Sequence, residues 1–391
     1  MKIDSVDFFY LSMPAVLDIG DGSQDALLVR IRAGNYEGWG ECEASPLTSI
    51  ASYVCPMSHS ACKPLKHSLE GKSINHAKDI KQITEDVRQH SFDLLQADHT
   101  LSGIDIALWD LWGKKLEEPV YKLLGYKKAY PKLPYASQLF GETPEETFLK
   151  GQKAKAMGFR AVKFGWGSFG KKGLKHDRAQ LKAARESVGK DVLLMIDAGT
   201  IWNNKLAAAQ EILPDLKKIN VCWLEEPFGN LSLEKYKKLS KAKPSIALAA
   251  GEGCHNFTQA ELMIKYAGLK YIQADAGRIG GITAAKQVAE LANAAKVSYV
   301  NHTFTSHLAL SASLQPYAGI RKDAISEYPI ELKKLAQDIT RTKILPDKNG
   351  FIHLPEKEGL GIEINAEALR KYLVDAEIKV NGKTIYYTPE F

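Results

Sequence analysis

Residues 193–199 read LLMIDAG, a short apolar run that ends on Asp197 and is followed by turn-forming residues. The same pattern returns in CWLEEP, where the run ends on Glu225, and in LAAGEG, where it ends on Glu252. Asp197 and Glu225 lie 28 residues apart, and Glu225 and Glu252 lie 27 apart, which suits one strand plus one helix. Strands and helices that alternate at this interval predict a (β/α)₈ barrel.

Other polar residues end apolar runs at similar intervals. Lys163 stands 34 positions before Asp197, and three more residues follow Glu252 at steps of 23, 27 and 25, namely Asp275, His302 and Glu327. In a barrel of parallel strands the C-terminal strand ends meet at one mouth, where active sites are found. We therefore expect all of these side chains around that mouth.

The regular alternation covers only the middle of the chain. Residues 1–125 show strand-like alternation and then two helical patterns, which predicts an α+β domain. In the second helical stretch, SGIDIALWDLWGKKL, Ser102 is expected to cap the helix. The barrel is assigned to residues 126–350. Residues 351–391 form a C-terminal segment that contains a helix and, at Asn381-Gly382, a hairpin signal.

Composition excludes several classes of function. With 45% hydrophobic and 25% charged residues, the chain has the balance of a globular protein. The net charge of +6 is spread over 391 residues, and the lysine-rich stretches lack interleaved aromatics, so no nucleic-acid partner is expected. No apolar run reaches the roughly 18 residues of a membrane span. Five scattered cysteines without a CxxC pair indicate reduced thiols and a cytoplasmic location.

Asp197, Glu225 and Glu252 would bring three carboxylates to one barrel mouth. Like charges this close repel strongly at low dielectric, so they need a cation between them. Oxygen-only ligands favour a hard ion, and we expect Mg²⁺. Neighbours on a strand point to opposite faces, so only one of Glu225 and Glu226 can face the ion. A single acid of this kind is more often a surface strand end, but three at equal spacing favour a metal site.

The remaining strand-end residues suit proton transfer beside a small-molecule carboxylate substrate. Lys163 can neutralise the substrate carboxylate, with a structural pair to one of the acids as the alternative. An aspartate at 275 that bonds one imidazole nitrogen of His302 leaves the other nitrogen as a general base, with a purely structural histidine as the alternative. Glu327, if protonated, can hydrogen-bond a developing oxyanion. Together these parts suggest abstraction of a proton α to a carboxylate.

The chain as a whole resembles the enolase superfamily and, within it, the mandelate racemase branch. The resemblance lies in an ordered set of motifs: GWGECEAS, VKFGW, MIDAG, WLEEP, GEG, DAGRIGGIT, SEYP and EGLGIEI. It implies a modified barrel whose mouth is covered by a cap made of the N-terminal region and the C-terminal tail. Specificity loops are expected around residues 18–21 and 44–52. Relatives are commonly dimers or octamers, so the resemblance also implies a homo-oligomer.

The same resemblance implies roles for individual residues. It makes the first glutamate of the LEEP motif a ligand, so that the Mg²⁺ ligands are Asp197, Glu225 and Glu252. Asp275 and His302 become the base dyad, and Glu327 becomes the partner of the enediolate.

Two positions depart from the pattern of the branch. Its members usually carry a KxK on the second strand, whose second lysine is a base on the face opposite the histidine. Here Lys163 is followed by Phe164 and Gly165, and Gly165 shares a face with Lys163 but supplies no base. Relatives often have an asparagine at the place of Gly199. With a single base, His302, we expect loss of a β-hydroxyl after proton abstraction rather than racemisation.

We therefore expect a Mg²⁺-dependent dehydratase that converts a sugar acid into a 2-keto-3-deoxy acid. Trp166, beside the gap at Gly165, is a candidate wall of the sugar pocket, with plain packing as the alternative. Gln138 and His307 are further candidates for substrate contacts. An epimerase, racemase or cycloisomerase that takes a second base from elsewhere remains an alternative, as does a non-catalytic relative that binds a carboxylate ligand.

Overall fold

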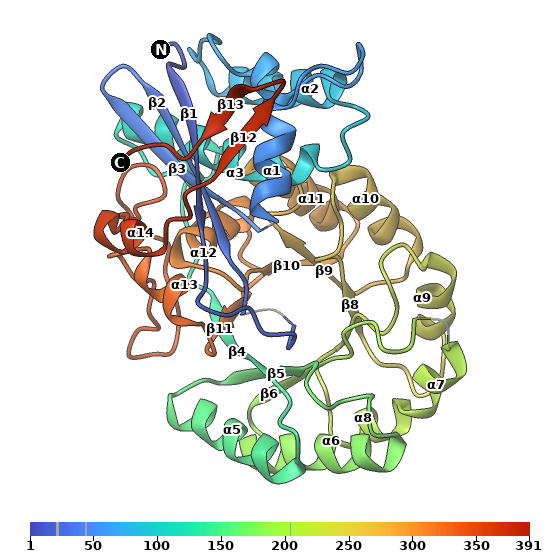
Figure 1. Ribbon diagram of the computed structural model, residues 1–391. Coiled ribbons are helices and arrows are strands. Elements are labelled where there is room, and N and C mark those ends of the chain that lie inside the picture. The colour runs from blue at the N-terminus through green and yellow to red at the C-terminus, as the bar shows by residue number, and fades with distance from the viewer. Residues whose placement is uncertain (21–22, 44, 204) are drawn as a thin grey trace.

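The computed structural model describes residues 1–20, 23–43, 45–203 and 205–391. A small antiparallel sheet with its helices lies on one side of a parallel barrel, and the end of the chain returns to that sheet (Figure 1). The predicted barrel with an α+β cap is therefore confirmed. Asp21 and Ala44, which belong to the expected specificity loops, lie outside the described residues.

The cap is built on a three-stranded antiparallel sheet of β1 (Ser5–Leu11), β2 (Ala26–Ala33) and β3 (Tyr36–Cys42). The helices that follow are α1 (Pro46–Val54), the 3₁₀ helix η1 (Leu65–Ser68), α2 (Ala77–His90), α3 (Ala97–Leu116) and α4 (Val120–Leu123). Most of the segment 44–52, expected as a loop, is helix α1. Pro46 starts that helix, because a proline in the first turn costs no hydrogen bond.

Helix α3 connects the cap sheet to the barrel, and nearly all of its residues as far as Gly113 are buried. It begins five residues before Ser102, whose hydroxyl donates to the carbonyl of Asp98 inside the helix. The predicted cap at Ser102 is therefore wrong. Asp98 in the first turn favours the earlier start, because a negative charge stabilises a helix N-terminus. No helix in the described part of the chain is long and apolar enough to cross a membrane.

Glycines make the closest contacts between α3 and the cap sheet. A Cβ built on Gly40 would lie 2.0 Å from the carbonyl oxygen of Gly103, and one on Gly38 would lie 2.1 Å from that of Ala107. Only a residue without a side chain allows backbones to approach this closely. The glycines of GWGE therefore allow the cap sheet to pack directly against helix α3.

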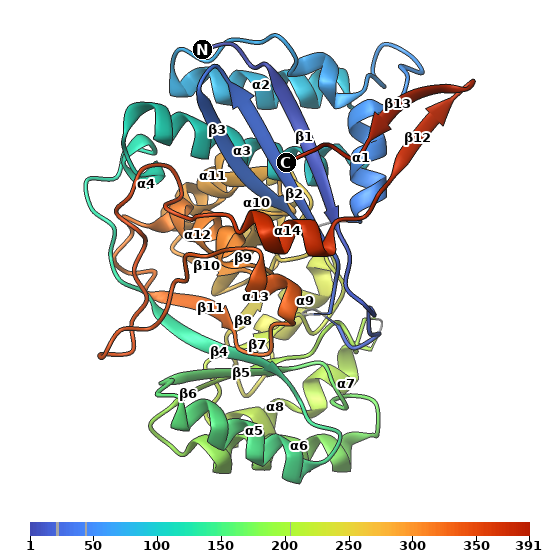
Figure 2. The ribbon, with the colours of Figure 1, turned by 60° about the vertical axis from the view of Figure 1, so that its left-hand side comes forward.

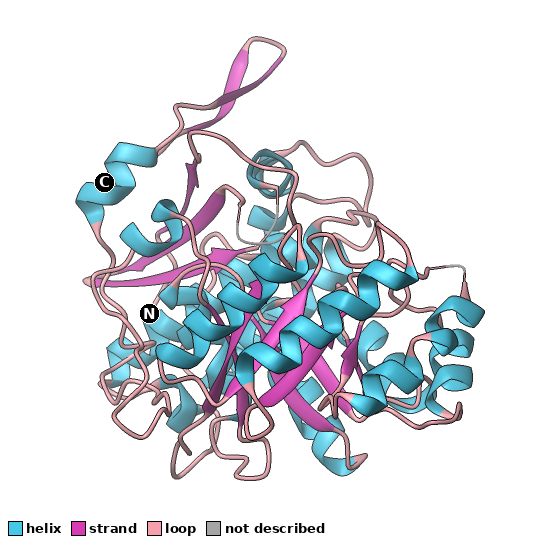
Figure 3. Ribbon diagram, turned by 90° about the horizontal axis from the view of Figure 1, so that it is seen from below, coloured by secondary structure: helices cyan, strands magenta, loops and turns pink. Residues whose placement is uncertain are grey.

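Eight parallel strands of the described residues form the barrel, in the order β10-β9-β8-β7-β6-β5-β4-β11. They are β4 (Leu133–Leu139), β5 (Ala161–Gly165), β6 (Leu193–Asp197), β7 (Leu224–Glu225), β8 (Leu248–Ala250), β9 (Tyr271–Asp275), β10 (Ser298–His302) and β11 (Ile325–Pro329). The helices between them pack over the outside of the strands (Figure 3). They are α5 (Pro144–Ala156), α6 (Leu174–Val188), α7 (Leu206–Glu211), α8 (Leu213–Lys218), α9 (Leu233–Ser240), α10 (Phe257–Tyr266), α11 (Gly281–Ala294), α12 (His307–Leu314) and the 3₁₀ helix η2 (Gln315–Tyr317).

The inside of the barrel is filled by side chains from alternate strand positions. They form a buried cluster of Tyr135, Ala161, Met195, Trp223, Ala249 and Val300. The next inward-facing position on each strand comes two residues later, toward the mouth. On β5, β6, β7 and β10 that position is occupied by Lys163, Asp197, Glu225 and His302. The apolar core thus sets which polar side chains point into the mouth.

Side chains help to close the barrel where β10 meets β11. Oδ1 of Asn301 accepts from the backbone N–H of Glu327 at 3.0 Å and from the hydroxyl of Tyr317 at 2.9 Å. The N–H of Thr303 donates to the Glu327 carboxylate at 2.9 Å. This seam fixes both the backbone and the carboxylate of Glu327 next to His302.

The end of the chain packs back on the cap (Figure 2). After β11 come α13 (Lys334–Asp338), α14 (Ala366–Tyr372) and a hairpin of β12 (Glu377–Val380) and β13 (Lys383–Tyr387), with the predicted turn at Asn381-Gly382. Buried Asp110 of α3 accepts from the N–H groups of Trp39 at 2.9 Å and Leu360 at 2.8 Å. One carboxylate therefore joins the helix, the cap sheet and the C-terminal segment.

The variant Gly40→Ala is expected to lower the free energy of unfolding by about 3 kcal/mol, because its methyl group would overlap the carbonyl of Gly103. Gly34→Ala is the matched control. Its Cβ would meet nothing within 4 Å, so only the strain of its positive φ remains, about 1 kcal/mol. Denaturant unfolding of both variants measures the difference. Equal losses in the two variants would contradict the packing argument.

Candidate active site

The polar residues that end the barrel strands lie together at one mouth. Strand pairing sets Gly165 beside Asp197, Asp197 beside Glu225, and Asp275 beside His302. None of the strand-end residues is more than 5% exposed: Lys163, Asp197, Glu225, Glu252, Asp275, His302 and Glu327. The structure thus brings together every strand-end residue that the spacing singled out. Charges interact strongly here because little water separates them.

Lys163 lies among the carboxylates. Its ammonium group contacts Glu225 and lies 2.9 Å from Oε1 of Glu327 and 3.6 Å from Oδ2 of Asp197. Burial by itself would lower the pKa of this lysine, but the charges of Glu225 and Glu327 raise it well above its ordinary value. Lys163 is therefore a permanent positive charge at the base of the site.

Asp197, Glu225 and Glu252 form an acidic group that one lysine does not fully neutralise. Burial is the main cause that raises the pKa of Asp197 to about 6 and that of Glu225 to about 7, against the opposing charge of Lys163. The N–H of Gly199 donates to Asp197 at 2.8 Å, and the indole of Trp223 donates to Glu225 at 2.8 Å. Buried, preorganised oxygen ligands of this kind fit a hard divalent cation.

Glu226 is a further buried acid next to this group. Its φ of 38° turns the chain out of the strand direction, so its side chain does not follow that of Glu225 into the barrel. Burial, and then the charge of Glu252, raises its pKa well above the ordinary value. Glu226 is therefore a buried neighbour of the three acids that does not point into the barrel with them.

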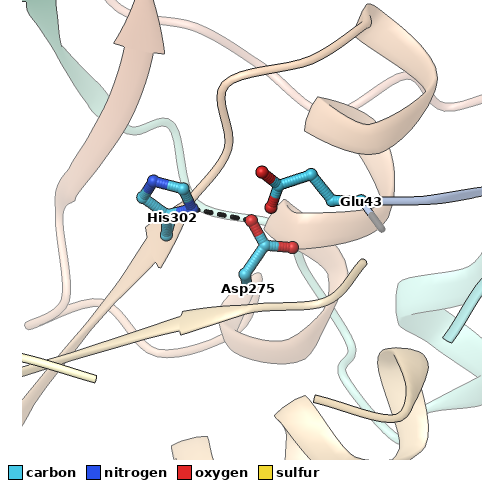
Figure 4. A group of neighbouring side chains, drawn as sticks. All are labelled: Glu43, Asp275 and His302. Carbon is cyan, nitrogen blue, oxygen red and sulfur yellow. Dashed lines mark hydrogen bonds and ion pairs between the residues drawn. The ribbon is translucent and has the colours of Figure 1, made fainter. Parts of the chain in front are cut away.

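Asp275 and His302 are arranged as a base dyad (Figure 4). Nδ1 of His302 lies 2.7 Å from Oδ2 of Asp275, and the N–H of Gly277 donates to Oδ1 at 2.6 Å. Burial by itself would raise the pKa of Asp275, but the hydrogen bond and charge of His302 hold it below its usual value. The ionised carboxylate keeps the proton on Nδ1. Nε2, the ring nitrogen that does not face Asp275, lies 3.3 Å from Glu252 and 3.8 Å from Glu327.

Glu327 lies at the seam of the barrel, between Lys163 and His302. Burial by itself would raise its pKa, but the nearby charges of Lys163 and His302 and the N–H of Thr303 lower it below the usual value. The carboxylate forms an ion pair with Lys163 and accepts from the backbone N–H of Thr303. These contacts favour its ionised form here, and its expected role as a protonated donor to an oxyanion stays a prediction.

Across the barrel from His302, the backbone position of Gly165 leaves no room for a basic side chain. A Cβ built on Gly165 would lie 2.7 Å from Cβ of Asp197 and 2.8 Å from its Oδ2. A Cβ built on Gly199 would lie 2.8 Å from the indole of Trp166, and one on Gly20 of the cap would lie 3.4 Å from the same ring. The two departures from the branch pattern are thus steric requirements. Gly165 makes room for Asp197, and Gly199 makes room for Trp166.

A cavity of about 20 Å³ lies between these residues. Its lining consists of Ser137, Gln138, Leu139, Lys163, Gly165, Trp166, Asp197, Glu252, His302 and Phe304. The space suits one water molecule, so a sugar-sized ligand requires movement of the side chains that cover it. Nε2 of Gln138 is buried and has no hydrogen-bond partner among the described residues, which suits a ligand oxygen.

His307 is not brought to this cavity. Its Nδ1 accepts from the backbone N–H of Ile344 at 3.2 Å, and its ring lies against Tyr328. Burial lowers its pKa to about 4, so the ring is a neutral acceptor. The prediction of a substrate contact for His307 is wrong, because the ring is already used to hold the chain that follows the barrel.

Two residues that sequence analysis did not single out also reach the dyad. Glu43 follows β3 directly, Arg278 lies three residues after Asp275, and the two form an ion pair. Glu43, Asp275 and His302 offer ligand atoms within 4.8 Å of one another (Figure 4). Such a set can hold a metal ion, but here Arg278 already supplies a positive charge to Glu43. Both residues stand inside quoted motifs, GWGECEAS and DAGRIGGIT, yet neither motif indicates that they meet.

Two protein families match this chain, one over most of the cap and one over most of the barrel. The family "Mandelate racemase / muconate lactonizing enzyme, N-terminal domain" matches residues 11–125, and "Enolase C-terminal domain-like" matches residues 150–368. A crystal structure from Rhodobacter sphaeroides, described as a predicted mandelate racemase, is 51% identical, has a TM-score of 0.95 and covers 100% of both chains.

Curated relatives with more specific names are more distant. The arabinonate dehydratase of Saccharolobus solfataricus is 27% identical over 70% of this chain and 71% of its own length. The D-galactarolactone cycloisomerase of Agrobacterium fabrum is 30% identical over 70% of this chain and 73% of its own. The names of these similar proteins describe different reactions, but the matched families and the site geometry agree. The chain belongs to the enolase superfamily, in its mandelate racemase-like branch.

Proposed function

We propose that the protein is a Mg²⁺-dependent dehydratase that converts a sugar acid, an aldonate or aldarate, into a 2-keto-3-deoxy acid. The observation that carries this proposal is the contrast between the two sides of the site. His302 and Asp275 supply a base on one side, and Gly165 has no room for a side chain on the other. A single base can remove a proton and return it to a leaving group, whereas racemisation needs a base on each face. The arabinonate dehydratase among the relatives supports this reaction class.

In the proposed reaction Lys163 pairs with the substrate carboxylate. Nε2 of His302 takes the proton from the carbon next to that carboxylate, and Asp275 stabilises the imidazolium that forms. Lys163 neutralises the charge that grows on the carboxylate oxygens. Protonated His302 then donates its proton to the β-hydroxyl group, which leaves as water. The resulting enol rearranges to the 2-keto-3-deoxy acid.

The metal ligands and the substrate contacts are part of the proposal. Mg²⁺, held by Asp197, Glu225 and Glu252, would supply positive charge to the carboxylate end of the substrate. Gln138 and Trp166 line the cavity beside His302. The Gln138 amide is proposed to donate to a substrate oxygen, and the Trp166 indole to cover an apolar face of the sugar.

A cycloisomerase is the second candidate, because one of the curated relatives carries that name. The two reactions differ in the mass of the product. Dehydration releases water and gives a 2-keto acid, whereas an isomerisation leaves the mass unchanged.

Incubation with Mg²⁺ and a panel of aldonic and aldaric acids is expected to give a 2-keto acid that reacts with semicarbazide. Mass spectrometry should show the loss of one water from the consumed acid. A product of unchanged mass would favour the cycloisomerase. Binding of the acids without turnover of any of them would support a non-catalytic protein and contradict the proposal.

The variant His302→Asn is expected to lower kcat by about 10³-fold, because the base that takes the α-proton is removed. Calorimetry should show Mg²⁺ binding close to that of the wild type. His307→Asn is the control, since His307 lies outside the cavity, and its kcat and KM should stay unchanged. Turnover by His302→Asn at the wild-type rate would show that another group is the base.

The variant Gly165→Ala is expected to weaken Mg²⁺ binding by about 10-fold, because its methyl group would displace the Asp197 carboxylate. Titration calorimetry measures this change without any substrate. Gly158→Ala is the control for a glycine-to-alanine change away from the site, since its Cβ would meet nothing within 4 Å. Unchanged affinity in Gly165→Ala would argue against Asp197 as a ligand.

A further inference from the structure

Glu43 of the cap reaches the base dyad. Its backbone N–H donates to the carbonyl of Gly277 at 3.1 Å, and its carboxylate is paired with Arg278. A Cβ built on Gly277 would lie 3.1 Å from Oδ1 of Asp275, 3.1 Å from the nitrogen of Glu43 and 3.2 Å from its Cβ. The end of β3 and the loop after β9 are therefore pressed together at the point where Asp275 is held.

This contact places two carboxylates side by side. Glu43 and Asp275 offer oxygens within 4.8 Å of each other and of His302, and the close-up shows the three side chains turned toward one another (Figure 4). Two carboxylates this close repel each other strongly at low dielectric unless a cation lies nearby. Arg278 is that cation, because it contacts Glu43 and its charge also acts on Asp275.

We propose that the Glu43–Arg278 pair is a positioning device through which the cap orients Asp275 and, through it, His302. The inference rests on the proposed role of His302 as the base. Neither Glu43 nor Arg278 touches substrate in this account. They act on the hydrogen bond between Asp275 and Nδ1 of His302.

The guanidinium group of Arg278 has more than one carboxylate within reach. Nη1 of Arg278 already lies 3.9 Å from Oε1 of Glu252. If Glu43 loses its charge, the guanidinium group is no longer held on the cap side, and it can pair with Asp275 or Glu252. An arginine bonded to Asp275 takes the carboxylate that keeps the proton on Nδ1 of His302. The tautomer and orientation of the base would then no longer be fixed.

The same pair links the dyad to the cap segment before β2. Nε2 of Gln24 lies 3.5 Å from Oε1 of Glu43, the oxygen that contacts Arg278. Gln24 stands close to Gly20, on which the Trp166 indole packs from the barrel side. Gln24 therefore joins the residues before β2 to the Glu43–Arg278 pair.

The test compares three variants of the full-length protein: Glu43→Gln, the double variant Glu43→Gln with Arg278→Gln, and Asp7→Asn. The double variant removes both charges of the pair. Asp7→Asn is the matched control. Asp7 also forms an ion pair with an arginine of the cap, Arg30, but this pair does not contact Asp275 or His302. The downfield Nδ1–H proton resonance of His302, assigned by its loss in His302→Asn, reports the hydrogen bond to Asp275 without any substrate.

Glu43→Gln is expected to shift or lose this resonance and to lower kcat by about 10–100-fold, the usual effect of removing a partner of a functional group. KM and the melting temperature should change little. The double variant should recover most of the kcat and the resonance, since no uncompensated guanidinium remains. Asp7→Asn should match the wild type in both readouts.

An unchanged His302 resonance in Glu43→Gln would overturn the proposal. So would a double variant whose kcat and resonance are no closer to the wild type than those of Glu43→Gln. A kcat loss accompanied by a large fall in melting temperature would also overturn it, because it would indicate general destabilisation. The resonance is measured without substrate, so it tests the positioning role even if no sugar acid is turned over. A shifted resonance with no turnover by the wild type would contradict the proposed dehydratase and leave the positioning role standing.

Discussion

The structure depends on the concentration of negative charge inside the barrel mouth. Asp197, Glu225, Asp275 and Glu327 are almost inaccessible to water, and burial alone disfavours the ionised form of each. Their pKa values differ because the positive charges near each carboxylate differ. Glu327 meets both Lys163 and His302, and Asp275 meets His302, so both have pKa values below their usual range. Asp197 and Glu225 share one lysine and remain above theirs, which marks the place where a further cation is needed.

The positions of these charges follow from the packing of the barrel. The buried cluster below the mouth determines which residues of each strand point inward, and the next inward residue is ionisable on four of the strands. The same inward orientation explains why one side of the site has no side chain at Gly165. Gly165 is inward-facing like Lys163, but Asp197 on the neighbouring strand occupies the space that a side chain would need. The asymmetry that favours elimination is therefore built into the strand pairing.

Features that recur at regular intervals along the chain could be predicted from the sequence. Spacing of the strand ends was enough for the barrel, and it also selected the seven polar residues that the structure brings together. Features that depend on long-range contacts could not be read from it. Nothing near Glu43 indicates Arg278, which lies 235 residues further along the chain. His307 was only a candidate for a substrate contact, and its ring instead accepts from Ile344, outside the cavity. The start of α3 was misplaced because Ser102 resembles a cap, whereas burial of the whole helix decides where it begins.

The central claim is that one base serves the site and that the opposite face has none. The stereochemistry of recovered substrate tests it most directly. An accepted sugar acid is converted part of the way in D₂O, and the unreacted acid is isolated and analysed by NMR. We predict that any deuterium at C2 is found only with the original configuration, because His302 can return a deuteron only to the face from which it took the proton. Deuterium in the C2 epimer would require a base on the other face and would contradict the account.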